Sequence, residues 1–86
     1  MPDRAKKLLE GMRRSPANWN SNDLAHLYEG FGFIIRCGSK HDIAKHPKYP
    51  YLRGTIPRHT TDPATGYITH AVKLITKLLE LEGKEG

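Results

Sequence analysis

Three consecutive β-strands are predicted by residues 33–56, which read FIIRCGSKHDIAKHPKYPYLRGTI. The first strand covers residues 33–37, where every second side chain belongs to the same face, and it stops at Gly38. After a hairpin turn, residues 41–46 have the length of a second strand, although two adjacent apolar residues leave its inward face open. The segment therefore predicts the start of an antiparallel meander.

Two prolines delimit the third strand. Pro47 and Pro50 confine the residues between them to a turn, because a proline nitrogen cannot donate a hydrogen bond within a sheet. Residues 51–56 follow, with Leu52 and Ile56 on one face. The other face is polar and basic and carries Tyr51, Arg53 and Thr55.

Helices are predicted before and after this sheet segment. Asp3 is expected to cap the first helix, which has apolar residues at helical spacing and ends near Arg14. Residues 18–22 offer turn and capping side chains for a second helix that Gly30 closes, so the two helices form a hairpin. A third, long helix is amphipathic, with an apolar face formed by Ile68, Ala71, Val72, Ile75, Leu78 and Leu79.

The order helix, helix, three strands, helix defines the predicted fold class. It is an α+β fold in which helices cover one face of a three-stranded antiparallel sheet. A chain of 86 residues can build only one small core, so residues 1–86 are predicted to form a single domain.

Charge and composition narrow the classes of function. Lys and Arg number 14 against 9 Asp and Glu, and the net charge of +5 favours polyanionic partners. No apolar run approaches the roughly 20 residues that span a bilayer, and the N-terminus lacks the apolar stretch of a signal peptide. We therefore expect a cytoplasmic protein with no membrane association. Because Cys37 is the only cysteine, an internal disulfide, a cysteine-based zinc site and a CxxC redox motif are all excluded.

The histidines are the strongest candidates for chemistry, since the sequence contains no glycine-rich phosphate-binding loop. Three of the five lie in or beside the predicted sheet: His41, His46 and His59. Strand pairing could bring these three near Lys40, Lys45, Arg53 and Arg58. His41 and His46 are five residues apart, which directs them to opposite faces of a strand, so we expect no metal site. His26 and His70 lie on predicted helices and are given no role.

A series of short motifs spans residues 5–80. Before the first strand come Asp23-Leu24, Leu27 and Gly30-Phe31-Gly32-Phe33. The strands and their connections then carry Gly38-Ser39-Lys40-His41, His46-Pro47 and Thr55-Ile56-Pro57-Arg58-His59. In order and spacing these motifs resemble the HicA family of mRNA interferase toxins. The family places His directly after Ser in its Gly-Ser-His turn, so Lys40 reads as one extra residue in that turn.

The resemblance implies a particular fold and activity. The fold is the double-stranded-RNA-binding-like α-β-β-β-α arrangement, here with an additional N-terminal helix. The activity is endoribonucleolytic cleavage of mRNA, restrained by a HicB-type antitoxin. The histidine of the Gly-Ser-His turn is the family's catalytic residue, and this role falls on His41.

RNA cleavage suits these residue types. RNA carries its own nucleophile in the 2′-hydroxyl, so a ribonuclease without metal or cofactor needs a base, an acid for the leaving 5′-oxygen, and cations for the phosphorane charge. Imidazole can act as base or acid, and we assign His41 as the principal acid/base. Lys40, Arg53 and Arg58 are expected to contact phosphates. His59 is either a second proton-transfer group or a structural hydrogen-bonding residue.

Two other functions stay open at this point. A noncatalytic double-stranded-RNA-binding module would use the same fold to contact phosphates and 2′-hydroxyls. A partner-binding subunit would use the basic face only to hold an acidic protein. Trp19, in the loop between the first two helices, is expected either to stack on a base or to cap the helical hairpin.

Overall fold

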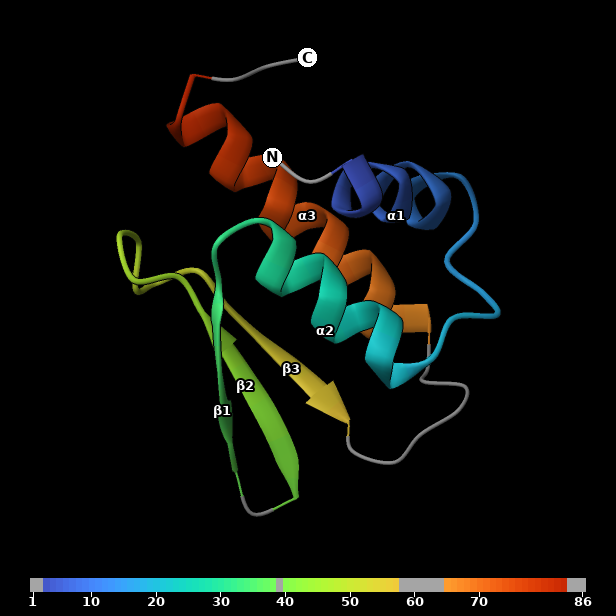
Figure 1. Cartoon of the computed structure of the whole chain (residues 1–86), viewed down its shortest axis with the longest axis horizontal. Coiled ribbons are helices and arrows are strands. Elements are labelled where there is room, and N and C mark those ends of the chain that lie inside the picture. Colours follow the sequence, from blue (N-terminus) through green and yellow to red (C-terminus); the bar gives the residue numbers. More distant parts are fainter. Residues whose placement is uncertain (1–2, 39, 58–64, 84–86) are drawn as a thin grey trace.

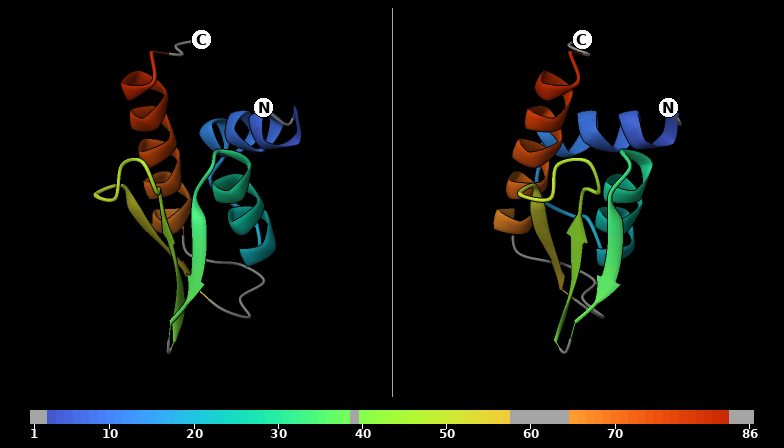
Figure 2. Two further views of the ribbon diagram at one scale, coloured as in Figure 1. Left: turned by 60° about the vertical axis from the view of Figure 1, so that its left-hand side comes forward. Right: turned by 90° about the vertical axis from the view of Figure 1, so that its left-hand side faces the viewer.

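Three helices and a three-stranded sheet make up the computed structural model, which describes residues 3–38, 40–57 and 65–83. In chain order the elements are α1 (Asp3–Arg14), α2 (Ser21–Gly30), β1 (Ile34–Cys37), β2 (His41–Lys45), β3 (Arg53–Pro57) and α3 (Thr65–Leu81). The strands pair antiparallel in the order β1-β2-β3, and the helices lie together on one side of the sheet (Figures 1 and 2). The predicted α+β class with a three-stranded antiparallel sheet is confirmed.

The helices are arranged in two levels above the sheet. α2 packs on β1 and β3, and α3 packs on β3, whereas α1 lies against α2 and α3 (Figure 2). Arg13 of α1 donates a 3.0 Å hydrogen bond to Oγ1 of Thr76 on α3, which fastens these two helices together at the surface. Among the residues described, no helix is both long and apolar enough to cross a membrane.

The connection between α1 and α2 is closed by side chains. Asn20 caps α2: its Oδ1 accepts from the backbone N–H of Asp23 at 2.8 Å, and Oδ2 of Asp23 accepts from the N–H of Asn20 at 3.2 Å. Trp19 donates from Nε1 to the carbonyl of Ser15 at 2.7 Å and packs against the core. The structure thus supports the second of its two predicted roles. The side chain of Asp3, predicted as the cap of α1, lies outside the described part of the chain.

The strand register settles which side chains face the helices. Ala44 faces them and is fully buried, while Ile43 faces away, which resolves the ambiguity that the two adjacent apolar residues left in the sequence. Leu52 and Ile56 are buried on the helix side, as predicted. The opposite side, which we call the open face, carries Ile34, Arg36, His41, Ile43, Lys45, Arg53, Thr55 and Pro57.

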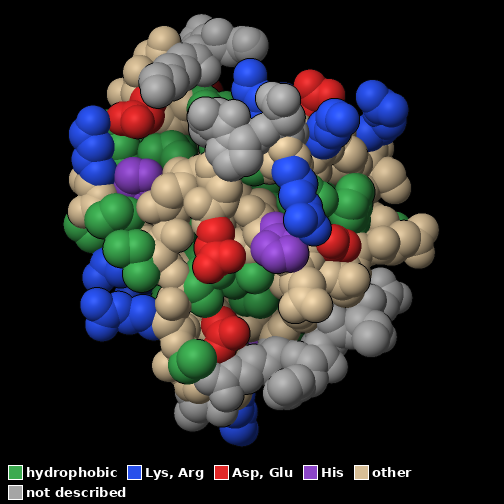
Figure 3. All heavy atoms as spheres, viewed as in Figure 1, with side chains coloured by type: hydrophobic (Ala, Val, Ile, Leu, Met, Phe, Trp, Pro, Cys, Tyr) green, Lys and Arg blue, Asp and Glu red, His purple; other side chains and the backbone are tan. Residues whose placement is uncertain are grey.

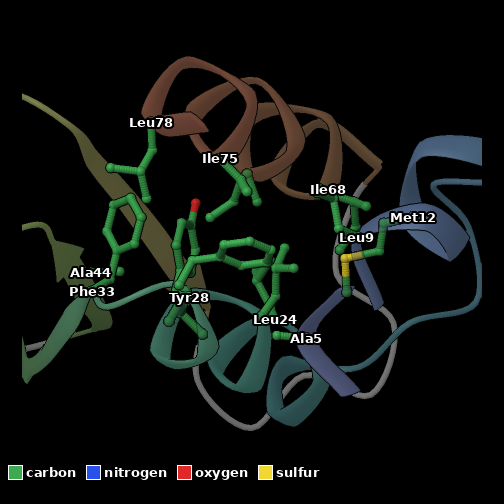
Figure 4. Packing of buried hydrophobic residues seen from close by; sticks show 14 of the residues in the cluster. Ala5, Leu9, Met12, Leu24, Tyr28, Phe33, Ala44, Ile68, Ile75 and Leu78 are labelled. Atoms are coloured by element: carbon green, nitrogen blue, oxygen red, sulfur yellow. The ribbon is translucent and has the colours of Figure 1, made fainter. Parts of the chain in front are cut away.

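A buried aromatic residue lies at the centre of the core. Tyr28 stands on α2 and reaches toward α3 and the sheet, with its ring centroid 5.1 Å from that of Phe33 (Figure 4). Its hydroxyl is buried with no hydrogen-bond partner among the residues described, and burial raises the pKa of this phenol. A Cβ atom at Gly54 of β3 would collide with this hydroxyl, so β3 approaches Tyr28 only because residue 54 lacks a side chain.

Candidate active site

His41 is the first residue of β2 and lies on the open face opposite Pro57 of β3. Its imidazole is half-buried and stacks on the ring of Tyr67 in α3, with 6.5 Å between ring centroids and 28° between ring planes. Tyr67 is 26 positions further along the chain (67 − 41), so this contact depends on how α3 packs. The stacking restricts the orientation of the imidazole without enclosing it.

The turn before β2 fixes the backbone of His41. Gly38 donates its N–H to the carbonyl oxygen of His41 at 2.9 Å, which joins the two ends of the β1–β2 connection. A Cβ atom at Gly38 would collide with that same oxygen. The glycine of the Gly-Ser-Lys-His motif is therefore required by a close backbone approach. Lys40 is exposed in this turn, directly beside His41 in the chain, and Ser39 lies outside the described residues.

A hollow of about 330 Å³ lies between β3 and the first turns of α3. It is lined by Thr55, Gly66, Tyr67 and His70. Tyr67 belongs both to this hollow and to the stack with His41, so it links the two. His70, at the other side of the hollow, lies toward Arg53 and away from His41.

His70 was given no role in the sequence, and the structure places it in this hollow. Its Nε2 atom lies 3.3 Å from the backbone carbonyl oxygen of Arg53. A carbonyl oxygen only accepts, so Nε2 must be the donor of this hydrogen bond. Its spacing of three residues from Tyr67 puts both on one side of a helix, but only the packing of α3 shows that this side meets β3.

The predicted phosphate-binding cations are not gathered at one point. Arg53 begins β3 and pairs with Lys45, whereas His41 pairs with Pro57 at the other end of the same strand. Four residues of strand correspond to about 13 Å, so the backbone of Arg53 is well separated from that of His41. Lys40 is adjacent to His41, while the predicted residues Arg58 and His59 lie outside the described part of the chain.

The charged side chains of the described strand residues on the open face are all positive. Its charged strand residues are Arg36, Lys45 and Arg53, and among the described strand residues on this face there is no Asp or Glu. Asp42, the one acidic residue of β2, points toward the helices. The side of the molecule in Figure 3, by contrast, shows basic and acidic side chains interspersed. The open face is thus the side of the sheet best suited to a polyanion.

His46 has a structural environment. It is only 8% exposed, its ring meets Phe33 edge-on at 5.2 Å and lies 5.4 Å from the ring of Tyr49, and its Nδ1 accepts from the N–H of Lys48 at 3.1 Å. Its burial against Phe33 on the helix side confirms that His41 and His46 point to opposite faces. Within the described residues, no cluster of three or more His, Cys, Asp or Glu side chains could hold a metal ion.

The sequence and the structure were also compared with known proteins. No model of a protein family, no curated protein and no solved structure matches the chain. A functional proposal therefore rests on the chemistry of its own residues and on the motif resemblance.

Proposed function

We propose that this chain is a HicA-like mRNA interferase, a cytoplasmic endoribonuclease that uses no metal ion. The observation that carries the proposal is the position of His41. Its imidazole is half-buried against Tyr67 on the open face, and the described strand residues of that face include no Asp or Glu. The order α2-β1-β2-β3-α3 supports the proposed double-stranded-RNA-binding-like arrangement, with α1 as the additional helix.

The proposed reaction is transesterification within the RNA strand. A base removes the proton of the 2′-hydroxyl, the 2′-oxygen forms a bond to the adjacent phosphorus, and the bond to the 5′-oxygen breaks as that oxygen receives a proton. The products carry a 2′,3′-cyclic phosphate and a 5′-hydroxyl. His41 serves as principal acid/base, and Lys40, its exposed neighbour in the turn, contributes positive charge near the reacting phosphate.

Arg53 binds the RNA substrate away from the phosphodiester bond that is cleaved. Because it is about four strand residues from Pro57, it would contact a phosphate further along the RNA. With Lys45 opposite it and Arg36 on β1, it forms a positive surface from one end of the open face to its middle.

A HicB-type antitoxin is the proposed inhibitor. The surface to be covered is the open face with His41, and an acidic partner surface would complement its charge. A stable interface of standard size takes about 800 Å² from each partner. A footprint of that size centred on the open face would cover His41, so inhibition should compete with RNA binding.

Cleavage of a defined RNA by purified protein tests the function. We expect new RNA ends bearing 2′,3′-cyclic phosphate in the presence of a chelator, detected by mass spectrometry of the fragments. Binding without new ends would favour the noncatalytic RNA-binding module. Loss of cleavage with chelator and its return with a divalent ion would replace the proposed mechanism by metal-assisted hydrolysis.

A further inference from the structure

Tyr51 has the most exposed large hydrophobic side chain among the described residues, with 67% of its surface open to solvent. It lies in the connection between β2 and β3, at the end of the sheet remote from His41. We propose that the ring of Tyr51 is a stacking platform for an unpaired base of the RNA, while Arg53 and Lys45 contact the phosphates beside that base. This inference rests on the proposed ribonuclease function and adds that the substrate is single-stranded where it meets this end of the sheet.

A neighbouring aromatic residue supports the exposed ring. The ring centroids of Tyr49 and Tyr51 are 6.2 Å apart with 70° between the ring planes, which is an edge-to-face contact. Tyr49 is itself held in place, because its hydroxyl donates to Oε2 of Glu82 at 3.0 Å and its ring lies 5.4 Å from that of His46. Tyr51 is thus packed against an ordered neighbour while most of its surface stays available to a ligand.

Two cations lie beside Tyr51. Arg53 is two residues further along the chain, so its Cα atom is within about 7 Å of that of Tyr51. Lys45 of β2 pairs with Arg53, and both side chains are exposed. An exposed aromatic ring next to cations is the combination with which proteins bind single-stranded nucleic acid, since a base stacks on the ring and the phosphates lie against the cations. The positive charge favours a polyanion over an apolar protein surface as the occupant.

An unpaired strand suits this surface better than a duplex. Aromatic side chains stack on bases of single-stranded RNA, whereas the bases of a duplex are already stacked on one another. Six residues of extended chain lead from Tyr51 to Pro57, the residue opposite His41, and they cover about 20 Å. Several nucleotides therefore separate the base on Tyr51 from the bond that is cleaved.

Binding of a single-stranded oligouridine tests the platform, measured in the His41→Ala background so that the RNA stays intact. Stacking on an aromatic side chain contributes a factor of about 5 to 150 in affinity for one base, so Tyr51→Ala should weaken binding by that factor. Tyr51→Phe should bind within about twofold of its parent, because it keeps the ring. The matched control is Ile34→Ala, which removes a 52% exposed apolar side chain from the same end of the sheet but no aromatic face. It should leave the affinity unchanged.

A duplex probe separates base stacking from phosphate binding. Oligouridine annealed to oligoadenylate keeps the phosphates but withdraws the faces of its bases, so Tyr51→Ala should not change the affinity for this duplex. An equal loss with the single strand and the duplex would show that the ring does not stack on unpaired bases. An equal loss in Ile34→Ala and Tyr51→Ala would show apolar contact instead of stacking. Either result would overturn the proposal.

Cleavage kinetics distinguish this proposal from the ribonuclease function itself. Because Tyr51 is far from the reacting bond, Tyr51→Ala should raise KM for a single-stranded RNA and leave kcat unchanged. If wild-type protein cleaves RNA and Tyr51→Ala binds oligouridine as tightly as its parent, the platform is rejected, and the exposed ring is left for a protein partner. If binding depends on Tyr51 but wild-type protein cleaves no RNA, the platform stands and the ribonuclease proposal is rejected.

Discussion

Two histidines at opposite ends of the same strand have opposite environments. His41 is the first residue of β2 on the open face and is half-buried, with the ring of Tyr67 stacked against it. His46 directly follows β2 on the helix side, nearly enclosed, with two aromatic neighbours and a backbone N–H bonded to its Nδ1. An imidazole that is packed and hydrogen-bonded contributes to stability, whereas one that is oriented but accessible can exchange protons with a substrate.

The two ends of the sheet differ in the same way. At the His46 end, Nζ of Lys48 and the hydroxyl of Tyr49 both lie 3.0 Å from Oε2 of Glu82, just beyond α3, so the β2–β3 connection is tied to that helix. Glu82 raises the pKa of Lys48 through this hydrogen bond and through its charge. Nearer His41, Thr55 of β3 and Tyr67 of α3 instead line a hollow. Side-chain interactions therefore hold one end of the sheet to α3, whereas a hollow separates β3 from the first turns of that helix.

The largest effect is expected from His41→Ala. General acid–base catalysis contributes about 10²- to 10⁴-fold, so RNA cleavage should fall by that factor, measured as initial rates with purified protein. Stability should change by less than about 0.5 kcal/mol, because a half-exposed ring at the start of a strand has little packing to lose. Undiminished cleavage by the folded variant would mean that His41 is not the acid/base.

His46→Ala should show the reverse pattern. Loss of a buried ring and of the acceptor for the Lys48 N–H should lower the free energy of unfolding by about 2 kcal/mol, measured by urea denaturation. Cleavage by the protein that remains folded should stay near the wild-type rate. His46→Asn is the matched variant, since its Oδ1 can replace the acceptor, and it should recover part of the stability. If His46→Ala were as stable as wild type but inactive, the contrast between the two histidines would be wrong.

Gly38→Ala should perturb the His41 end through the backbone. The added Cβ collides with the carbonyl oxygen of His41, so we expect a loss of about 1–2 kcal/mol of stability together with slower cleavage. Gly30→Ala is the control, because its added Cβ also collides with a neighbour, the Cβ atom of Ala5 on α1, but does so on the helical side of the molecule. It should lower stability as well and leave cleavage by the folded protein unchanged. Equal slowing of cleavage by the two substitutions would contradict a specific role for the turn.

The smallest effect is expected from single cations of the open face. Arg53→Gln should weaken RNA binding and reduce the slope of log K against log salt by about 0.7, the value for one phosphate contact on a single strand. Binding is best measured in the His41→Ala background, where the RNA stays intact. Lys6→Gln on α1 provides the control, since Lys6 is exposed on the helical side. If both substitutions changed the slope equally, RNA would not be confined to the open face.

Local patterns in the sequence predicted the helices and strands of the described structure and their order, although β3 runs over Arg53–Pro57 where residues 51–56 had been expected. Alternation predicted the two faces of β3, helical spacing predicted the apolar face of α3, and proline and glycine predicted the connections. The opposite orientation of His41 and His46 also followed, because five residues along a strand reverse the direction of a side chain. In β2, Ile43 and Ala44 are adjacent and both apolar, so alternation alone did not show which of them faces the helices.

The strand register and the position of α3 on the sheet were decided only by tertiary packing. They separate Arg53 from His41, although both had been expected to serve one cationic site. They also bring His70 to the hollow beside Tyr67. Whether two residues distant in the chain share a site depends on which turn of a helix meets which strand. That contact is set by the shape of the core as a whole, and no local periodicity encodes it.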